Sequence, residues 1–155
     1  AILGESAVSL FFLVGSIPAM FWLNSLGRRR LLIVSLALMT IGMMILGLFP
    51  TAPALVIIAA FGLYAFFSGG PGILQWLYPN ELFPTSVRAS AVGVSIAISR
   101  LGTIAATYSL PIMLSSFGVG PTMLSASGLL LVGLVLSIIM APETKGKSLT
   151  EASKL

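Results

Sequence analysis

The sequence contains no cysteine, no histidine and no aspartate, and only 8% of its 155 residues are charged. Without cysteine the chain forms no disulfide and offers no thiolate, and without histidine it lacks the commonest metal ligand and general base. Typical soluble domains carry charge on about a quarter of their residues. These absences exclude thiol chemistry and the usual zinc sites, and they set the chain apart from ordinary soluble proteins. We expect no cofactor, no metal and no enzymatic activity.

Apolar residues make up most of what remains, at 57% of the sequence, and the mean hydropathy is +1.11. A soluble domain of this size leaves much of its surface in water, so it has no room to bury so many apolar side chains. About 20 apolar residues cross a bilayer as a helix. Five runs reach or approach that length: 6–23, 31–49, 54–78, 89–115 and 121–141, followed by a tail at 142–155. The sequence predicts an all-α integral membrane protein with five transmembrane helices, in contact with the lipid bilayer.

The basic residues outside the apolar runs predict the orientation of the chain. With five spans, all of them fall on one side: Arg28, Arg29, Arg30, Arg88, Lys145, Lys147 and Lys154. Lys and Arg in short loops favour the cytoplasmic side. We therefore expect a cytoplasmic C-terminus, an N-terminus outside, and a bacterial inner membrane or a plasma membrane as location. The basic residues do not line one face together with aromatics, so no nucleic-acid partner is expected.

The third apolar run contains the sequence SGGPGILQW, from Ser68 to Trp76. Pro71 removes a backbone donor and clashes with the preceding turn. A kink or a local break near residues 68–72 is the expectation. Two interpretations stay open: a kink with small residues that let helices approach closely, or a discontinuous helix beside a ligand.

Two loops and the tail carry recognisable motifs: NSLGRRR at 24–30, PNELFPTSVR at 79–88, and PETKGKS at 142–148. In this order and on one side of the membrane, they resemble the sugar porter branch of the major facilitator superfamily. The resemblance implies helices eight to twelve of a twelve-helix transporter, a partial C-terminal half. The N-terminal half of the same transporter and its seventh helix would then be missing partners. One position departs from the pattern, because Asn24 stands where the family has an acidic residue.

The resemblance also implies a cytoplasmic gate, a charge network that closes one end of the bundle. Its members would be Arg28, Arg29, Glu81, Arg88 and Glu143. A plainer interpretation is that these are topogenic, solvated charges, each contributing well under about 1 kcal/mol.

Arg100 stands in the middle of the fourth run, twelve residues after Arg88. At 1.5 Å per residue it lies about 18 Å into the membrane. A charge at that depth is costly and faces a wet cavity or a partner carboxylate. Beside it, Ser95, Ser99, Thr103 and Thr107 recur at every fourth position and form one stripe. That stripe favours either a polar cavity wall or hydroxyls bonded to their own helix; Arg100 favours a cavity or an ion pair with the missing half.

The family places a Trp five residues before the loop glutamate, and here that position is Trp76, preceded by Gln75. The resemblance thereby extends the substrate-binding prediction to Gln75, Trp76, Ser99, Arg100 and Thr103. Sugar-selective members usually have an uncharged residue where Arg100 stands, whereas relatives that carry organic ions more often have arginine.

The function expected from these observations is secondary active transport of a small organic solute by alternating access. An organic anion or aromatic acid is the first expectation, with Arg100 as counter-ion. A neutral sugar or polyol, moved by symport with possible proton coupling, is the alternative. A transporter-like sensor that does not move its ligand is a third.

Overall fold

A computed structural model describes residues 2–141, without the side chains at 2–5, 7, 8, 24, 78, 81 and 82. Within that range the chain forms five helices and no strand: α1 (Ile2–Leu26), α2 (Arg28–Leu48), α3 (Ala54–Leu82), α4 (Arg88–Phe117) and α5 (Val119–Met140). The predicted runs coincide with these helices, one for one, and their ends differ by no more than four residues. The fold is all-α, as the sequence predicts.

Four of the helices are long and apolar enough to cross a membrane: α2, α4, α5 and the Ala54–Leu77 part of α3. In α1 the described apolar stretch is Ser9–Leu23, which is shorter than the 18 residues that define a candidate span. The run predicted at 6–23 lies within α1, which is 25 residues long.

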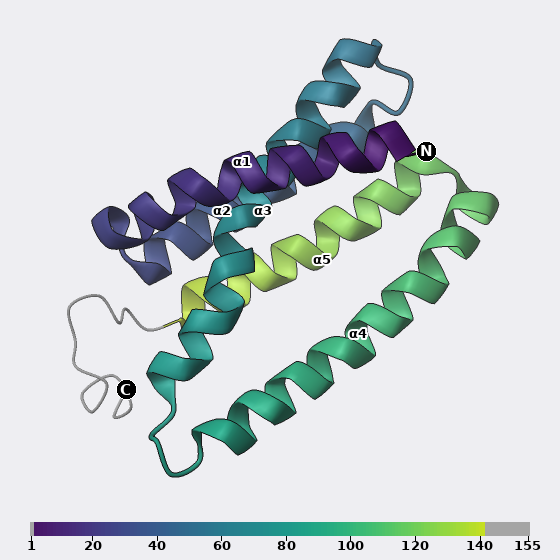
Figure 1. Cartoon of the computed structure of the whole chain (residues 1–155). Coiled ribbons are helices and arrows are strands. Elements are labelled where there is room, and N and C mark those ends of the chain that lie inside the picture. The colour runs from purple at the N-terminus through teal and green to yellow at the C-terminus, as the bar shows by residue number, and fades with distance from the viewer. Residues whose placement is uncertain (1, 142–155) are drawn as a thin grey trace.

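Single glycines join two of the helix pairs. Gly27 separates α1 from α2, and Gly118 separates α4 from α5. Both have positive φ values, 89° and 79°, in the left-handed region that glycine adopts without steric penalty. These two residues let the chain reverse direction within one residue, so α2 and α5 fold back along the helices that precede them (Figure 1).

Packing is uneven across the bundle. α3 packs along both α1 and α2, and α5 packs along α2, whereas α4 contacts its neighbours only sparsely. Buried apolar residues at the centre are Met43, Leu46 and Ala60. Figure 1 shows α4 standing apart from the other helices, and no residue of α4 is buried. The chain therefore presents one closely packed group of four helices and one helix with both flanks open.

α3 continues as a helix through residues 68–72, so the local break anticipated at Pro71 is absent. The glycines beside it serve close approach instead. A Cβ on Gly69 would lie 2.7 Å from the backbone nitrogen of Ser16 in α1, and one on Gly70 would lie 2.5 Å from Oγ of Ser35 in α2. Both distances are below any tolerable contact, so α3 passes α1 and α2 here only because side chains are missing. Small residues at a helix crossing are the usual way in which membrane helices meet closely.

Replacing Gly69 by alanine should therefore destabilise the bundle. The added methyl group meets the backbone of α1, which cannot move aside cheaply, and we expect a loss of about 1–3 kcal/mol. Gly62→Ala is the matched control on the same helix, because its Cβ would meet only the Phe11 ring at 3.7 Å. Thermal unfolding of the two variants in detergent measures the difference; equal midpoints would contradict the close crossing.

Candidate substrate pocket

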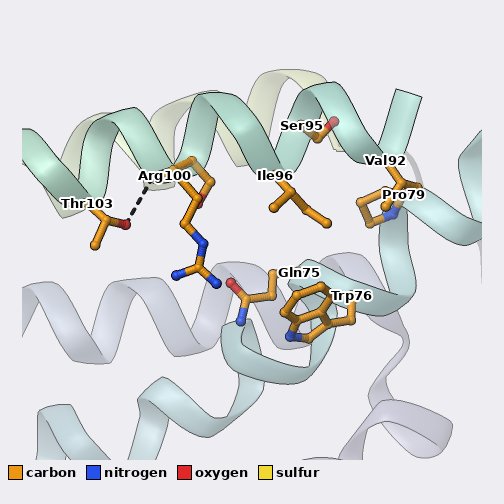
Figure 2. A pocket seen from close by; sticks show the side chains of 9 residues that line it. Gln75, Trp76, Pro79, Val92, Ser95, Ile96, Arg100 and Thr103 are labelled. Carbon is orange, nitrogen blue, oxygen red and sulfur yellow. Dashed lines mark hydrogen bonds between the residues drawn. The ribbon is translucent and has the colours of Figure 1, made fainter. Parts of the chain in front are cut away.

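A pocket of about 280 Å³ lies between the second half of α3 and the first half of α4. We call it the α3–α4 pocket. Its lining residues are Gln75, Trp76, Pro79, Val92, Ser95, Ile96, Ser99, Arg100 and Thr103. All five residues predicted to bind substrate are among them, and Figure 2 shows the side chains from the two helices facing one another.

The remaining lining residues follow from the helical period of α4. Counting back from Arg100 in steps of four gives Ile96 and Val92, which share its face. The pattern could have identified them, but apolar residues on a membrane helix carry no signal of their own. Pro79 also carried no signal of a pocket residue, because the sequence assigned it to the loop motif.

Arg100 is the only cation among the described residues that line the pocket. Its guanidinium is exposed on α4 and projects toward Gln75 of α3 (Figure 2). Within residues 2–141 it has no hydrogen bond and no ion pair. An arginine at the centre of a membrane helix costs at least about 2.5–3.5 kcal/mol. None of the described side chains that line the pocket is acidic.

The hydroxyl groups of the stripe donate to their own helix. Ser95 Oγ donates to the Ala91 carbonyl at 2.8 Å, Thr103 Oγ1 to Ser99 at 3.0 Å, and Thr107 Oγ1 to Thr103 at 2.8 Å. The plainer interpretation of the stripe is therefore right for these three. Each proton is already used, so Ser95 and Thr103 present only oxygen lone pairs to the pocket.

Donors dominate the remaining lining groups. Arg100 carries five N–H groups, Gln75 an amide NH₂ and Trp76 an indole N–H, while the hydroxyl group of Ser99 makes no hydrogen bond within the described chain. The Trp76 side chain is 53% exposed, so its ring offers an open face to a ligand. The pocket can thus bind oxygen acceptors, receive hydroxyl protons at Ser95 and Thr103, and stack one flat or apolar surface.

The basic segments gather at one end of the bundle, where the α1–α2 and α3–α4 connections and the end of α5 lie (Figure 1). There Arg29 Nη2 donates to the carbonyl of Ile138 at 2.8 Å, and its Nε is buried without a hydrogen-bond partner. Arg88 Nε donates to the Phe83 carbonyl at 3.0 Å. Of the predicted gate, the Glu81 side chain and all of Glu143 fall outside the described residues. Arg29 thus links α2 to the end of α5 by this hydrogen bond.

Arg29→Ala should loosen that attachment. Ile138 is among the last carbonyls of α5, which have no partner within the helix. A hydrogen bond to a charged group contributes about 1.5–3 kcal/mol, and we expect a thermal midpoint lowered accordingly in detergent. Arg30→Ala removes the same charge from the next, exposed position and should leave the midpoint close to that of the unsubstituted protein. Equal losses in both variants would assign the effect to charge alone.

Comparison with known families decides the class of protein. The model of the family described as "Sugar (and other) transporter" matches residues 2–155. The chain belongs to this family. The predicted relationship to sugar porters is therefore confirmed, and the relatives are transport proteins rather than enzymes.

Among relatives of the sugar transporter family, "Putative metabolite transport protein YaaU" of Escherichia coli is 54% identical over the whole chain, which covers 35% of that protein. "Probable polyol transporter 6" of Arabidopsis thaliana is 33% identical over 86% of the chain and 29% of its own length. The chain thus spans about a third of the relatives that it matches.

Solved structures give the same fold. The inward open xylose transporter XylE of E. coli superposes with a TM-score of 0.86 at 25% identity, over 95% of this chain and 34% of XylE. A second structure of XylE, described as a major facilitator superfamily proton:xylose symporter, gives 0.89 at 23% identity, over 99% of this chain and 34% of XylE. The five helices are therefore one part of a major facilitator fold, in an integral membrane protein.

Proposed function

We propose that this chain forms part of a secondary transporter for a small polyhydroxylated solute of the sugar or polyol kind. The α3–α4 pocket carries the proposal, because it gathers polar groups from two facing helices and reaches Arg100 and Thr103 near the middle of the α4 span. Transporters of this fold bind solutes near the membrane midplane. A polyol transporter among the relatives and the xylose transporter among the structural neighbours support a hydroxylated solute.

Alternating access is the proposed mechanism. The packed group of α1, α2, α3 and α5 would act as one rigid unit, and α4 would face the N-terminal half of the same transporter across the substrate. Proton symport is proposed from the likeness to XylE, which is described as a proton:xylose symporter. No acidic residue stands between Arg88 and Met140. The proton carrier is therefore proposed to lie outside α4 and α5.

An organic anion or aromatic acid is the second candidate for the solute. Arg100 is the observation that favours it, because a guanidinium in the pocket has no counter-charge within the described chain. Measured flux separates both candidates from a sensor that binds its ligand without moving it.

Thr103→Val tests the pocket with a change that hardly alters side-chain shape. The hydroxyl oxygen is lost as an acceptor for the solute, and one hydrogen bond contributes about 0.5–1.5 kcal/mol, so the KM for uptake should rise about 2- to 10-fold. Thr107→Val is the matched control: this hydroxyl makes the same bond one turn further on but does not line the pocket. Uptake into proteoliposomes by the full-length transporter is the measurement. An equal change in both variants would argue against binding at this site.

The gate at the basic end is also a proposal, with Arg28, Arg29, Glu81, Arg88 and Glu143 as its members. We propose that this end faces the cytoplasm of a bacterial inner membrane or the corresponding side of a plasma membrane. Arg29 and Arg88 already bond backbone carbonyls at this end. Carboxylates from Glu81 and Glu143 would complete the network and hold the end closed while the pocket faces outward.

Glu81→Gln should weaken that closure, because a neutral amide attracts the arginines far less than a carboxylate. A cysteine placed in the pocket at Ser99 should then react faster with a membrane-impermeant thiol reagent applied from the cytoplasmic side. Glu151→Gln, in the tail beyond the motif, serves as control. Unchanged reactivity in Glu81→Gln would leave the charges with a topogenic role only.

A further inference from the structure

The lining of the α3–α4 pocket contains two kinds of group that a neutral sugar or an aromatic acid satisfies only in part. One is the guanidinium of Arg100, which is charged and without a partner in the described chain. The other is a set of neutral polar groups, Gln75, Ser95, Ser99 and Thr103, spread over both helices. A ligand that fits the pocket must supply a negative charge for Arg100 and hydrogen-bonding groups for the neutral side chains.

The charge of Arg100 calls for one anionic group. Its planar fork of N–H donors matches the two oxygens of a carboxylate, and a charge-assisted pair of this kind is far stronger than a bond to a hydroxyl. The only other side chain that Figure 2 shows near the guanidinium is the neutral carboxamide of Gln75. Arg100 is the single cation in the described lining. A singly charged carboxylate is balanced by it, whereas a phosphate of charge near −2 is not.

The hydroxyl oxygens call for donors on the ligand. Ser95 and Thr103 have already given their protons to Ala91 and Ser99, so each can only accept. An aromatic carboxylate without hydroxyl or amino groups, such as benzoate, carries no donors for these oxygens and would leave them unpaired when the pocket closes, which is unfavourable. A chain or ring with several hydroxyl groups supplies the missing donors and also accepts from Gln75 and Ser99.

The indole of Trp76 offers a third contact to the ligand, a flat apolar face. Its ring is half-exposed at the edge of the pocket, beside Pro79 (Figure 2). An indole face accepts the apolar C–H face of a sugar as well as it accepts an aromatic ring. This contact alone does not distinguish a sugar from an aromatic ring, and a polyhydroxylated ligand can make it.

We infer that the solute bound in the α3–α4 pocket is a polyhydroxy monocarboxylate, an acidic relative of a sugar or polyol. Its carboxylate pairs with Arg100, its hydroxyl groups bond Gln75, Ser95, Ser99 and Thr103, and its C–H face lies on Trp76. This inference rests on the proposed function and narrows its substrate class.

Two matched pairs of solutes test it with the full-length transporter in proteoliposomes. D-Gluconate and D-glucitol share a six-carbon hydroxylated chain and differ in the carboxylate, and D-glucuronate and D-glucose differ in the same way on a ring. Benzoate tests the charge without the hydroxyl groups. We expect each acid to enter at least 10-fold more efficiently, as kcat/KM, than its neutral partner and than benzoate.

Arg100→Gln should then lower the acid-to-neutral ratio of kcat/KM at least 10-fold, and Arg100→Lys should recover part of it, because the lysine keeps the charge but not the fork. Thr107→Val is the control whose ratio should stay constant. A thermal unfolding midpoint recorded for every variant shows that a lost preference is not lost folding.

Several results would overturn the inference. If the neutral solutes enter and the acids do not, the transporter function stands and Arg100 is part of an ion pair instead. If benzoate enters in preference to both hydroxylated acids, the anion site stands and the polyhydroxy requirement is wrong. If neither acid binds or enters at millimolar concentration, the inference fails whatever the neutral solutes do. If acid uptake persists unchanged in a folded Arg100→Gln variant, the carboxylate is bound elsewhere.

Discussion

The charge of one arginine at mid-membrane depth constrains the rest of this structure. Arg100 follows twelve residues after the first residue of α4, so its side chain cannot easily reach water by extending along the helix. Its placement is tolerable only next to water, an anion or a carboxylate. The face of α4 that carries it must therefore border a cavity, and the α3–α4 pocket lies along that face. Gln75 and Trp76 are the polar and aromatic side chains by which α3 lines the same pocket.

The remaining helices supply the rigidity that such a site needs. α3 approaches α1 and α2 so closely that residues 69 and 70 admit no side chain, and Arg29 holds α2 to the last turn of α5. Close contacts of this kind resist bending, so the positions of Gln75 and Trp76 on α3 are fixed relative to three other helices. α4 has no buried residue and lacks this support within the chain. The pocket accordingly has one firmly held wall and one wall whose position depends on what packs beyond it.

Hydropathy predicted the helices well because the bilayer sets a minimum length for every span, and that length is readable from composition. The helix ends were less accurate, because α2 begins at Arg28 and α3 ends at Leu82, within charged or polar segments that hydropathy assigns to loops. Of the two interpretations of the segment around Pro71, the contacts of the glycines support close helix approach, and the helix has no local break there. Here Gly69 and Gly70 bring α1 and α2 against the same turn. The pocket residues were predicted from Arg100 and from the motif beside Trp76, whereas Val92 and Ile96 were not, because only their face distinguishes them from lipid-facing residues.

The loops and the pocket carry different kinds of information about the solute. The loop motifs are proposed to close one end of the bundle. That task would be the same for any solute, so a family resemblance in the loops says little about the ligand. The pocket is where solutes are distinguished, and there a cation stands among hydroxyl acceptors and an open indole face. Membership in a family of sugar and other transporters accounts for the neutral polar groups. It does not account for Arg100. A guanidinium binds a neutral sugar no better than an uncharged donor does, yet placing its charge in the membrane has a large desolvation cost. A solute that is both hydroxylated and anionic removes this conflict, since the same ligand satisfies the groups typical of the family and the one group that departs from it.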